Sequence, residues 1–396
     1  MIERLAKKIE RVAGGGGIQA IKNKAIEVEQ TGKKVIRMET GLPDFDTPAY
    51  IKKAAIESLE RGDVFYMPAL GLKSLREEIS KKLKRDNQLD YGIDEIMIVS
   101  GLAEGVFDAL NAILDEGDEI LLPDPIWPNY IDVAHLAGAK VVPFVLKEEN
   151  DFQIDMEELY SKVTEKTKAI VLISPNNPTG SVLTKETFKK IADFAIEKNL
   201  FVVSDEIYER IVYDGEEPFS IGSLPGMRER TITLNGFSKA YSMTGWRLGY
   251  VAADRPIIQA MNKIHQQNTA NSVSFGQYGA LAALTGKEET EEVGKMVAEY
   301  KRRRDYIVEH LNAIDGVSCA VPKGAFYMWI NIKELPMTST EFAYYLLEEE
   351  GVALVPGPVF GEHSEGYLRM SFATAYDEIV EACERIKRAV EKLQNR

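Results

Sequence analysis

Lys239 and Arg247 lie eight residues apart on a stretch that joins two apolar runs. The alternating residues 231–234 predict a strand, and Lys239 follows it after an Asn-Gly break. A desolvated lysine beside other cations binds its proton less tightly and can form a Schiff base with a carbonyl. The planar fork of Arg247 suits a phosphate. The pair indicates a cofactor with a carbonyl and a phosphate, pyridoxal phosphate; the alternative is a solvated lysine and a surface ion pair.

The composition narrows the class of protein. The chain has 396 residues, which predicts two or three compact units. Its 48 basic and 62 acidic residues give a net charge of −14, which argues against nucleic acid and anionic membranes as partners. The two cysteines, Cys319 and Cys383, do not form a disulfide scaffold, and the four histidines show no metal-ligand spacing. We therefore expect no metal and a reducing compartment.

No apolar run is long enough to cross a membrane, and the first residues lack the apolar core of a signal peptide. We expect a cytoplasmic protein. Ile2, Leu5, Ile9 and Val12 follow helical spacing, which predicts an amphipathic arm. The glycine run 14–17 then predicts a flexible hinge, or alternatively a mobile lid over a substrate pocket.

Strands and helices alternate from about residue 95 to 253, which predicts a mainly parallel sheet covered by helices on both faces. The expected strands are 95–100, 119–123, 141–145, 168–173, 200–204, 231–234 and 248–253. A long helix at 288–312 then leads to a smaller α+β unit with strands at 317–321, 325–332 and 367–372. The predicted parts are an arm and hinge (1–17), the N-terminal part of a small domain (18–47), a large domain (48–286) and the C-terminal small domain (287–396).

Residues that could bind a ligand follow several of these strands. Gly101, Leu102 and Ala103 open a helix directly after a strand, where free N–H groups and the helix dipole favour an anion. Trp127 follows the strand 119–123, at the end where α/β proteins bind ligands, although a core tryptophan is the alternative.

Two charged residues lie in or directly after apolar strands. Asp205 follows the strand 200–204, and a buried carboxylate there needs a cation such as a pyridinium nitrogen, which would keep the ring an effective electron sink. Tyr208, three residues on, could reach the oxygen of the same ring. Arg369 needs an anion, either in a structural ion pair or as the α-carboxylate of an amino acid.

Five motifs occur in order: GLPDF (41–45), SPNNPTG (174–180), SDEIY (204–208), SK-x7-R-x-G-Y (238–250) and YLRMSF (367–372). With them, the chain from about residue 35 to 373 resembles the class I and II aminotransferases of the fold-type I pyridoxal-phosphate family. The resemblance implies a large domain with a seven-stranded, mainly parallel sheet, a smaller α+β domain, and a homodimer with shared active sites.

The resemblance also implies roles for single residues. Lys239 would hold the cofactor and act as general base and acid, aided by Asp205 and Tyr208. Other cofactor contacts would come from Gly101, Leu102, Ala103, Arg247, Trp127, Asn177 and, across the dimer interface, Tyr66. Substrate contacts would come from Gly41, Asn177 and Arg369, with apolar surface from Ile18, Trp127 and Phe326. One residue departs from the pattern: Gly236 stands where many relatives have a phosphate-binding serine, and whether Ser238 contacts the phosphate stays open.

The implied activity is ping-pong transamination between an amino acid and a 2-oxo acid. The charges that bind a distal carboxylate in two branches of the family are replaced here by Gln266 and Ala103. We therefore expect neutral or aromatic donors with 2-oxoglutarate as acceptor; aspartate as donor is an alternative. A carbon–sulfur β-lyase or a decarboxylase-type enzyme on the same scaffold is a second. A ligand sensor is a third, which the acidic balance and the lack of a basic helix-turn-helix segment before Val35 disfavour.

Overall fold

The centre of the protein is a seven-stranded sheet with the strand order β2-β8-β7-β6-β5-β3-β4. The structure, a computed structural model, describes residues 6–14 and 16–395. Neighbouring strands from β7 to β4 are parallel, whereas β8 is antiparallel to both of its neighbours. The strands are β2 (Ile96–Val99), β3 (Glu119–Asp124), β4 (Lys140–Val145), β5 (Thr167–Ile173), β6 (Phe201–Asp205), β7 (Thr231–Gly236) and β8 (Gly249–Ala252). The predicted mainly parallel sheet is confirmed.

The central strands are apolar because both faces of the sheet are covered. On β5, Val171 and Ile173 belong to one buried cluster, while the alternate residues Ile170 and Leu172 belong to a second. The covering helices include α4 (Leu102–Ile113), α5 (Asn129–Leu136), α6 (Met156–Lys162), α7 (Lys185–Glu197) and α8 (Arg255–Asn268). A third cluster joins α2 (Ala49–Arg61), α3 (Lys73–Lys82) and α9 (Ser274–Thr285) near β2 and β8.

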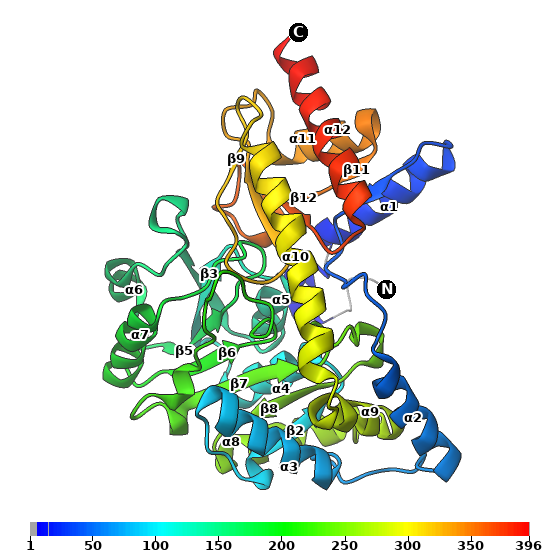
Figure 1. Ribbon diagram of the computed structural model, residues 1–396. Helices are drawn as coiled ribbons and strands as arrows, with labels where there is room; N and C mark the ends of the chain where they lie inside the picture. The colour runs from blue at the N-terminus through cyan, green and yellow to red at the C-terminus, as the bar shows by residue number, and fades with distance from the viewer. Residues whose placement is uncertain (1–5, 15, 396) are drawn as a thin grey trace.

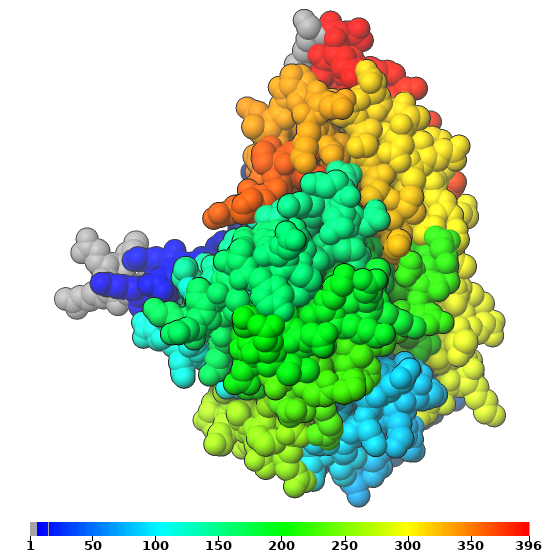
Figure 2. Space-filling model, turned by 90° about the vertical axis from the view of Figure 1, so that its left-hand side faces the viewer, coloured from blue at the N-terminus to red at the C-terminus, as the bar shows by residue number. Residues whose placement is uncertain are grey.

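A smaller unit contains the antiparallel sheet β12-β13-β10-β9. Its strands are β9 (Ser318–Cys319), β10 (Tyr327–Asn331), β12 (Val355–Pro356) and β13 (Tyr367–Ser371), with helices α11 (Ser339–Tyr345) and α12 (Tyr376–Gln394). The long helix α10 (Glu289–Leu311) contacts α9 at the large sheet's side and α12 and β9 in the smaller unit (Figure 1). Figure 2 shows the C-terminal segments, orange to red, stacked above the green segments of the large unit.

The N-terminal part differs from the sequence prediction. Helix α1 (Gly16–Gln30) begins within the glycine run, so Gly16 and Gly17 are helical rather than a hinge. Gly17 lies against Val359, where a side chain would not fit. Residues Lys7–Arg11 form a short 3₁₀ helix with no buried side chain, so that part of the arm packs no apolar face. Ile2, Leu5 and Gly15 lie outside the described residues.

Helix α1 packs on the smaller unit. It contacts β12 and β11 (Val352–Ala353), and β11 pairs in parallel with β1 (Ile36–Arg37). These contacts place residues 16–37 beside the C-terminal segments, although the four domain boundaries stay predictions. Across residues 6–14 and 16–395, no helix combines the length and the apolar character needed to span a bilayer.

Candidate active site

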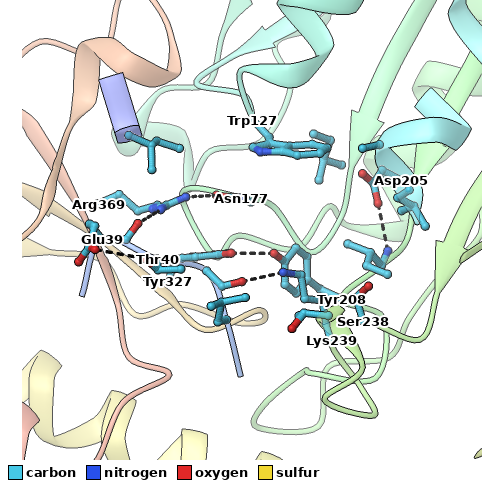
Figure 3. Close-up of a pocket in the computed structure, with 18 of the residues that line it drawn as sticks. Glu39, Thr40, Trp127, Asn177, Asp205, Tyr208, Ser238, Lys239, Tyr327 and Arg369 are labelled. Carbon is cyan, nitrogen blue, oxygen red and sulfur yellow. Dashed lines mark hydrogen bonds between the residues drawn. The ribbon is translucent and has the colours of Figure 1, made fainter. Parts of the chain in front are cut away.

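A cavity of about 350 Å³ lies at the carboxyl ends of the parallel strands, where both units meet. The large unit contributes the ends of β5 and β6 and the loop after β7, and the smaller unit contributes β10 and β13. Figure 3 shows Arg369 and Asn177 toward one side of this cavity and Asp205 at the other. Residues more than 300 positions apart in the chain therefore share one wall.

Lys239 lines the cavity directly after β7. Its Nζ donates a hydrogen bond to the Gly41 carbonyl at 2.7 Å. Burial, together with the Arg369 and Arg247 guanidinium groups nearby, lowers the pKa of the Lys239 amine to about 8. A larger fraction of this amine is neutral near pH 7 than for a surface lysine, so it can attack a carbonyl or accept a proton.

Asp205 ends β6 and is 4% exposed. It accepts hydrogen bonds from the Tyr130 hydroxyl at 2.8 Å and from the Ile207 backbone N–H at 3.1 Å. Burial raises the pKa of the Asp205 carboxyl to about 6, although both hydrogen bonds oppose the shift. A carboxylate in this environment is stabilised by a cation brought into the cavity.

Arg247 reaches the N-terminus of α4 from the loop before β8. Its guanidinium donates to the carbonyls of Thr244 (3.1 Å) and Ser100 (3.4 Å), and it forms no ion pair with a described carboxylate. The guanidinium lies against Gly101, whose φ of 84° favours glycine at this position. The first N–H groups of α4, at Leu102 and Ala103, have no carbonyl within the helix to bond. The arginine and the helix end together form a site for a dianion.

Gly236 packs against the neighbouring antiparallel strand. A Cβ there would lie 2.9 Å from Gly249 Cα and 3.0 Å from Leu102 Cδ1. The place of the family's serine is therefore too narrow for a side chain in this chain. Ser238 instead lines the cavity, two residues further along.

Arg369 is 2% exposed and has no carboxylate partner among the described residues. It donates to the Asn177 Oδ1 at 3.1 Å and to the Glu39 carbonyl at 2.6 Å. The Tyr327 and Phe360 rings lie on it, each with its centroid 4.7 Å from Cζ. The Nε atom is buried without a hydrogen-bond partner. This guanidinium is therefore fixed in place and can still bind an anion.

The hydroxyl groups of Tyr208 and Tyr327 are 2.8 Å apart and connect the two units (Figure 3). Phe326, the residue before Tyr327, is fully buried and does not line the cavity. It packs behind Tyr208 and Tyr300, with ring centroids 5.5 and 5.3 Å away. Phe326 lies in the turn before β10, and Tyr327, the first residue of that strand, faces the cavity in place of the predicted Phe326.

The model of the family "Aminotransferase class I and II" matches residues 33–386. The chain belongs to this family. It is 45% identical to an aspartate aminotransferase of Pyrococcus abyssi, over 93% of this chain and 94% of the relative. It is 41% identical to the aromatic-amino-acid aminotransferase 2 of Thermococcus litoralis, over 93% and 95%. The crystal structure of an aromatic aminotransferase from Pyrococcus horikoshii aligns with a TM-score of 0.90 at 43% identity, over 93% and 99%.

The aminotransferase cavity gathers most of the residues predicted from the sequence. The predicted residues that line it are Ile18, Gly41, Leu102, Ala103, Trp127, Asn177, Asp205, Tyr208, Lys239, Arg247 and Arg369. Gly101 lies beside it under Arg247. Tyr66 is 90% exposed and does not line the cavity of its own chain. The functional roles of these residues stay predictions.

Sequence reasoning missed several residues of this aminotransferase. The cavity wall also includes Lys22, Glu39, Thr40, Leu42, Ile173, Ile207, Thr244 and Tyr327, and Tyr130 lies behind Asp205. Tyr327 directly follows the predicted Phe326, but its partner Tyr208 is 119 residues away, so no local pattern singled it out. Lys22 had a weak signal, since it lies one helical turn after the predicted Ile18.

A buried charged cluster lies at the start of α4, beside the anion site. Glu104 Oε1 is 3.1 Å from His265 Nδ1, and Asp108 Oδ2 is 3.8 Å from the same nitrogen. The carboxyl groups and the imidazole lie within 4.8 Å of one another, although their spacing in the sequence did not indicate it. Because Glu104 also accepts from the Ser100 N–H and from Thr269 at 2.6 Å, its charge is well solvated by the protein. The absence of a metal stays a prediction.

The contact at Gly236 generates a stability prediction. We expect Gly236→Ser to lower the free energy of unfolding by about 1–3 kcal/mol, because the side chain must push apart β7, β8 and the start of α4. Gly245→Ser is the matched control, since nothing lies within 4 Å of a Cβ there. Urea denaturation of the two variants and the parent measures the difference. Equal stability of all three proteins would contradict the packing described for Gly236.

Proposed function

We propose that this chain is a pyridoxal-phosphate-dependent aminotransferase that moves an amino group from an amino acid to a 2-oxo acid by a ping-pong reaction. The observation that carries the proposal is Lys239, an amine of lowered pKa between an anion site and a buried carboxylate. Membership of a family that uses this cofactor supports it further.

The residues of the cavity fit this cofactor. Arg247 and the N-terminus of α4 would hold its phosphate, and Lys239 would hold its carbonyl carbon. Asp205, a buried carboxylate in need of a cation, would pair with the protonated ring nitrogen. Trp127 would pack on the ring, while Tyr208 and Asn177 would reach its hydroxyl oxygen. When bound, the cofactor supplies the electron sink that makes the α-proton of an amino acid acidic.

The chain's own residues would orient the substrate and move its proton. Arg369 would bind the α-carboxylate, because its guanidinium is buried and has no carboxylate partner among the described residues. Asn177, which accepts a hydrogen bond from Arg369, would fix the same carboxylate from the other side. Lys239 Nζ would take the proton from the substrate α-carbon and return it on the cofactor side, as base and then as acid.

A reduction experiment tests the cofactor lysine. We expect borohydride to bleach the visible absorbance of the holoenzyme and to attach the reduced cofactor to the peptide that contains Lys239. Lys239→Ala should lower the rate of amino transfer at least about a hundredfold, because the proton carrier is lost. Mass spectrometry that places the adduct on another lysine would contradict the proposal. Release of free ammonia together with pyruvate, rather than transfer of the amino group to an acceptor 2-oxo acid, would favour the β-lyase.

We propose further that the active unit is a homodimer with shared sites. Phe65 and Tyr66 are 80% and 90% exposed, and they belong to a loop whose Asp63 carbonyl accepts a hydrogen bond from Ser274. Val273 and Phe275, beside Ser274, are also exposed. Large apolar side chains gathered at one place favour an interface between subunits. The partner subunit's Tyr66 would then complete the phosphate site.

Mixing two inactive variants tests the shared sites. Lys239→Ala lacks the lysine but carries Tyr66, and Tyr66→Ala has the opposite defect. Subunit exchange between equal amounts should create one intact site in about four, because half of the dimers are hybrids. We expect amino-transfer activity to recover toward that fraction. Labelled subunits serve as the control for exchange; exchange without recovered activity would argue that each site is built from one chain.

The donor is proposed to be a neutral or aromatic amino acid, with 2-oxoglutarate as acceptor. Ala103 beside the phosphate site is uncharged, Gln266 is neutral and exposed, and Ile18 and Trp127 offer apolar surface to the cavity. The relative from Thermococcus litoralis is named for aromatic amino acids. Aspartate is the second candidate, since the relative from Pyrococcus abyssi is named for it.

A panel of donors decides between the two. We expect phenylalanine or tyrosine to exceed aspartate in kcat/KM with 2-oxoglutarate as the fixed acceptor, because the donor pocket offers apolar contacts. The measurement is steady-state kinetics on the holoenzyme. An aspartate advantage of tenfold, about 1.4 kcal/mol of transition-state binding, would instead establish the second candidate.

A further inference from the structure

Lys22 is a cation of the cavity that the proposed reaction does not use. The basic side chains of the wall are Lys22, Lys239, Arg247 and Arg369. The last three are matched to the cofactor carbonyl, the phosphate and the α-carboxylate in the proposed function. Lys22 is half-buried, and among residues 6–14 and 16–395 no hydrogen bond or ion pair holds its ammonium group. Lys24, on the same helix, pairs with Glu348 at 2.8 Å.

The position of α1 puts Lys22 on the same side of the cavity as Arg369. Gly17, in the first turn of α1, packs against Val359, and the adjacent Phe360 ring lies on the Arg369 guanidinium. Ile18 and Lys22 are four residues apart and therefore lie on one face of the helix, and both line the cavity. A substrate whose α-carboxylate binds Arg369 can extend its side chain toward this face.

Glu39, an acidic residue of the cavity wall, already forms an ion pair with Arg37. Its Oε1 accepts from Arg37 Nη2 at 2.7 Å and from the Thr40 hydroxyl at 3.2 Å. The Glu39 side chain is fully buried, and its Oε2 has no hydrogen-bond partner. An alternative role of Lys22 is therefore to balance the negative charge of Glu39 without direct contact. That role would affect all ligands of the cavity alike, whereas direct binding of a ligand carboxylate would affect only ligands that carry one there.

We propose that Lys22 is the specificity residue that binds the distal carboxylate of dicarboxylic substrates, above all the C5 carboxylate of 2-oxoglutarate. The inference rests on the proposed function, in which 2-oxoglutarate and a neutral donor share one cavity. A lysine has a long, flexible stem with a strongly hydrated head. It can therefore pair with a carboxylate inside the cavity and turn outward when an apolar side chain occupies the same space. An arginine or lysine that is locked in an ion pair could not do both.

Two unreactive ligands isolate this step from catalysis. Glutarate carries the distal carboxylate, and 3-phenylpropionate replaces it with a ring. Calorimetric titration of the holoenzyme should show Lys22→Met weakening glutarate about tenfold, the scale of one charge-assisted hydrogen bond, while 3-phenylpropionate changes less than about twofold. Lys22→Arg should keep the affinity for glutarate. Lys24→Met is the matched control, with the same chemical change on the same helix, and should alter neither ligand.

The kinetic counterpart uses the two half-reactions. In Lys22→Met the KM for 2-oxoglutarate should rise about tenfold while the KM for phenylalanine stays within about twofold. Equal losses for both ligands would assign Lys22 to balancing Glu39 and would overturn the proposal, as would an unchanged affinity for glutarate. If glutarate binding is weakened selectively but no amino transfer occurs, the proposed function fails and the role of Lys22 stands.

Discussion

The burial of positive charge at the carboxyl ends of β6 and β7 is the constraint on which the site depends. Lys239 shares a cavity with Arg369 and Arg247, and burial together with repulsion from these two guanidinium groups lowers its pKa. Asp205 is the carboxylate that acts against this effect on Lys239. Asp205 and the loop that carries Lys239 are held by neighbouring strands of one sheet, in which Val202–Asp205 of β6 pairs in parallel with Thr231–Leu234 of β7.

The active-site cavity needs both units, because neither unit alone supplies all of the charged side chains that line it. Arg369 comes from β13, and its hydrogen-bond partners are Asn177 after β5 and the Glu39 carbonyl after β1. Lys239 bonds the Gly41 carbonyl, two residues from Glu39. A relative movement of the smaller unit would therefore disturb the substrate and cofactor ends of the cavity at once. The contact between the hydroxyl groups of Tyr208 and Tyr327 supplies a further connection.

The sequence predicted the elements whose local hydrophobic pattern matches their position in the folded protein. The apolar strands β5 and β6 and the turn into α4 have clear patterns, so Asp205 and the anion site could be placed. Helix α1 was missed because its first residues are glycines, whose poor helix propensity is overridden by the packing of Gly17 on Val359. Tyr130 and Tyr327 could not be assigned from local pattern, because their partners Asp205 and Tyr208 are 75 and 119 residues away. Lys22 lay outside every motif that the sequence offered.

The cavity is positive, yet the chain around it carries a net charge of −14. An anionic molecule is therefore repelled at long range and attracted only once it has entered. Ionic strength acts on these two stages in opposite ways: salt screens the outer repulsion, over about 10 Å at 0.1 M, and so speeds encounter, while it weakens the partly exposed contacts inside. We therefore expect moderate salt to speed the association of an anionic substrate before higher salt weakens its binding in the cavity.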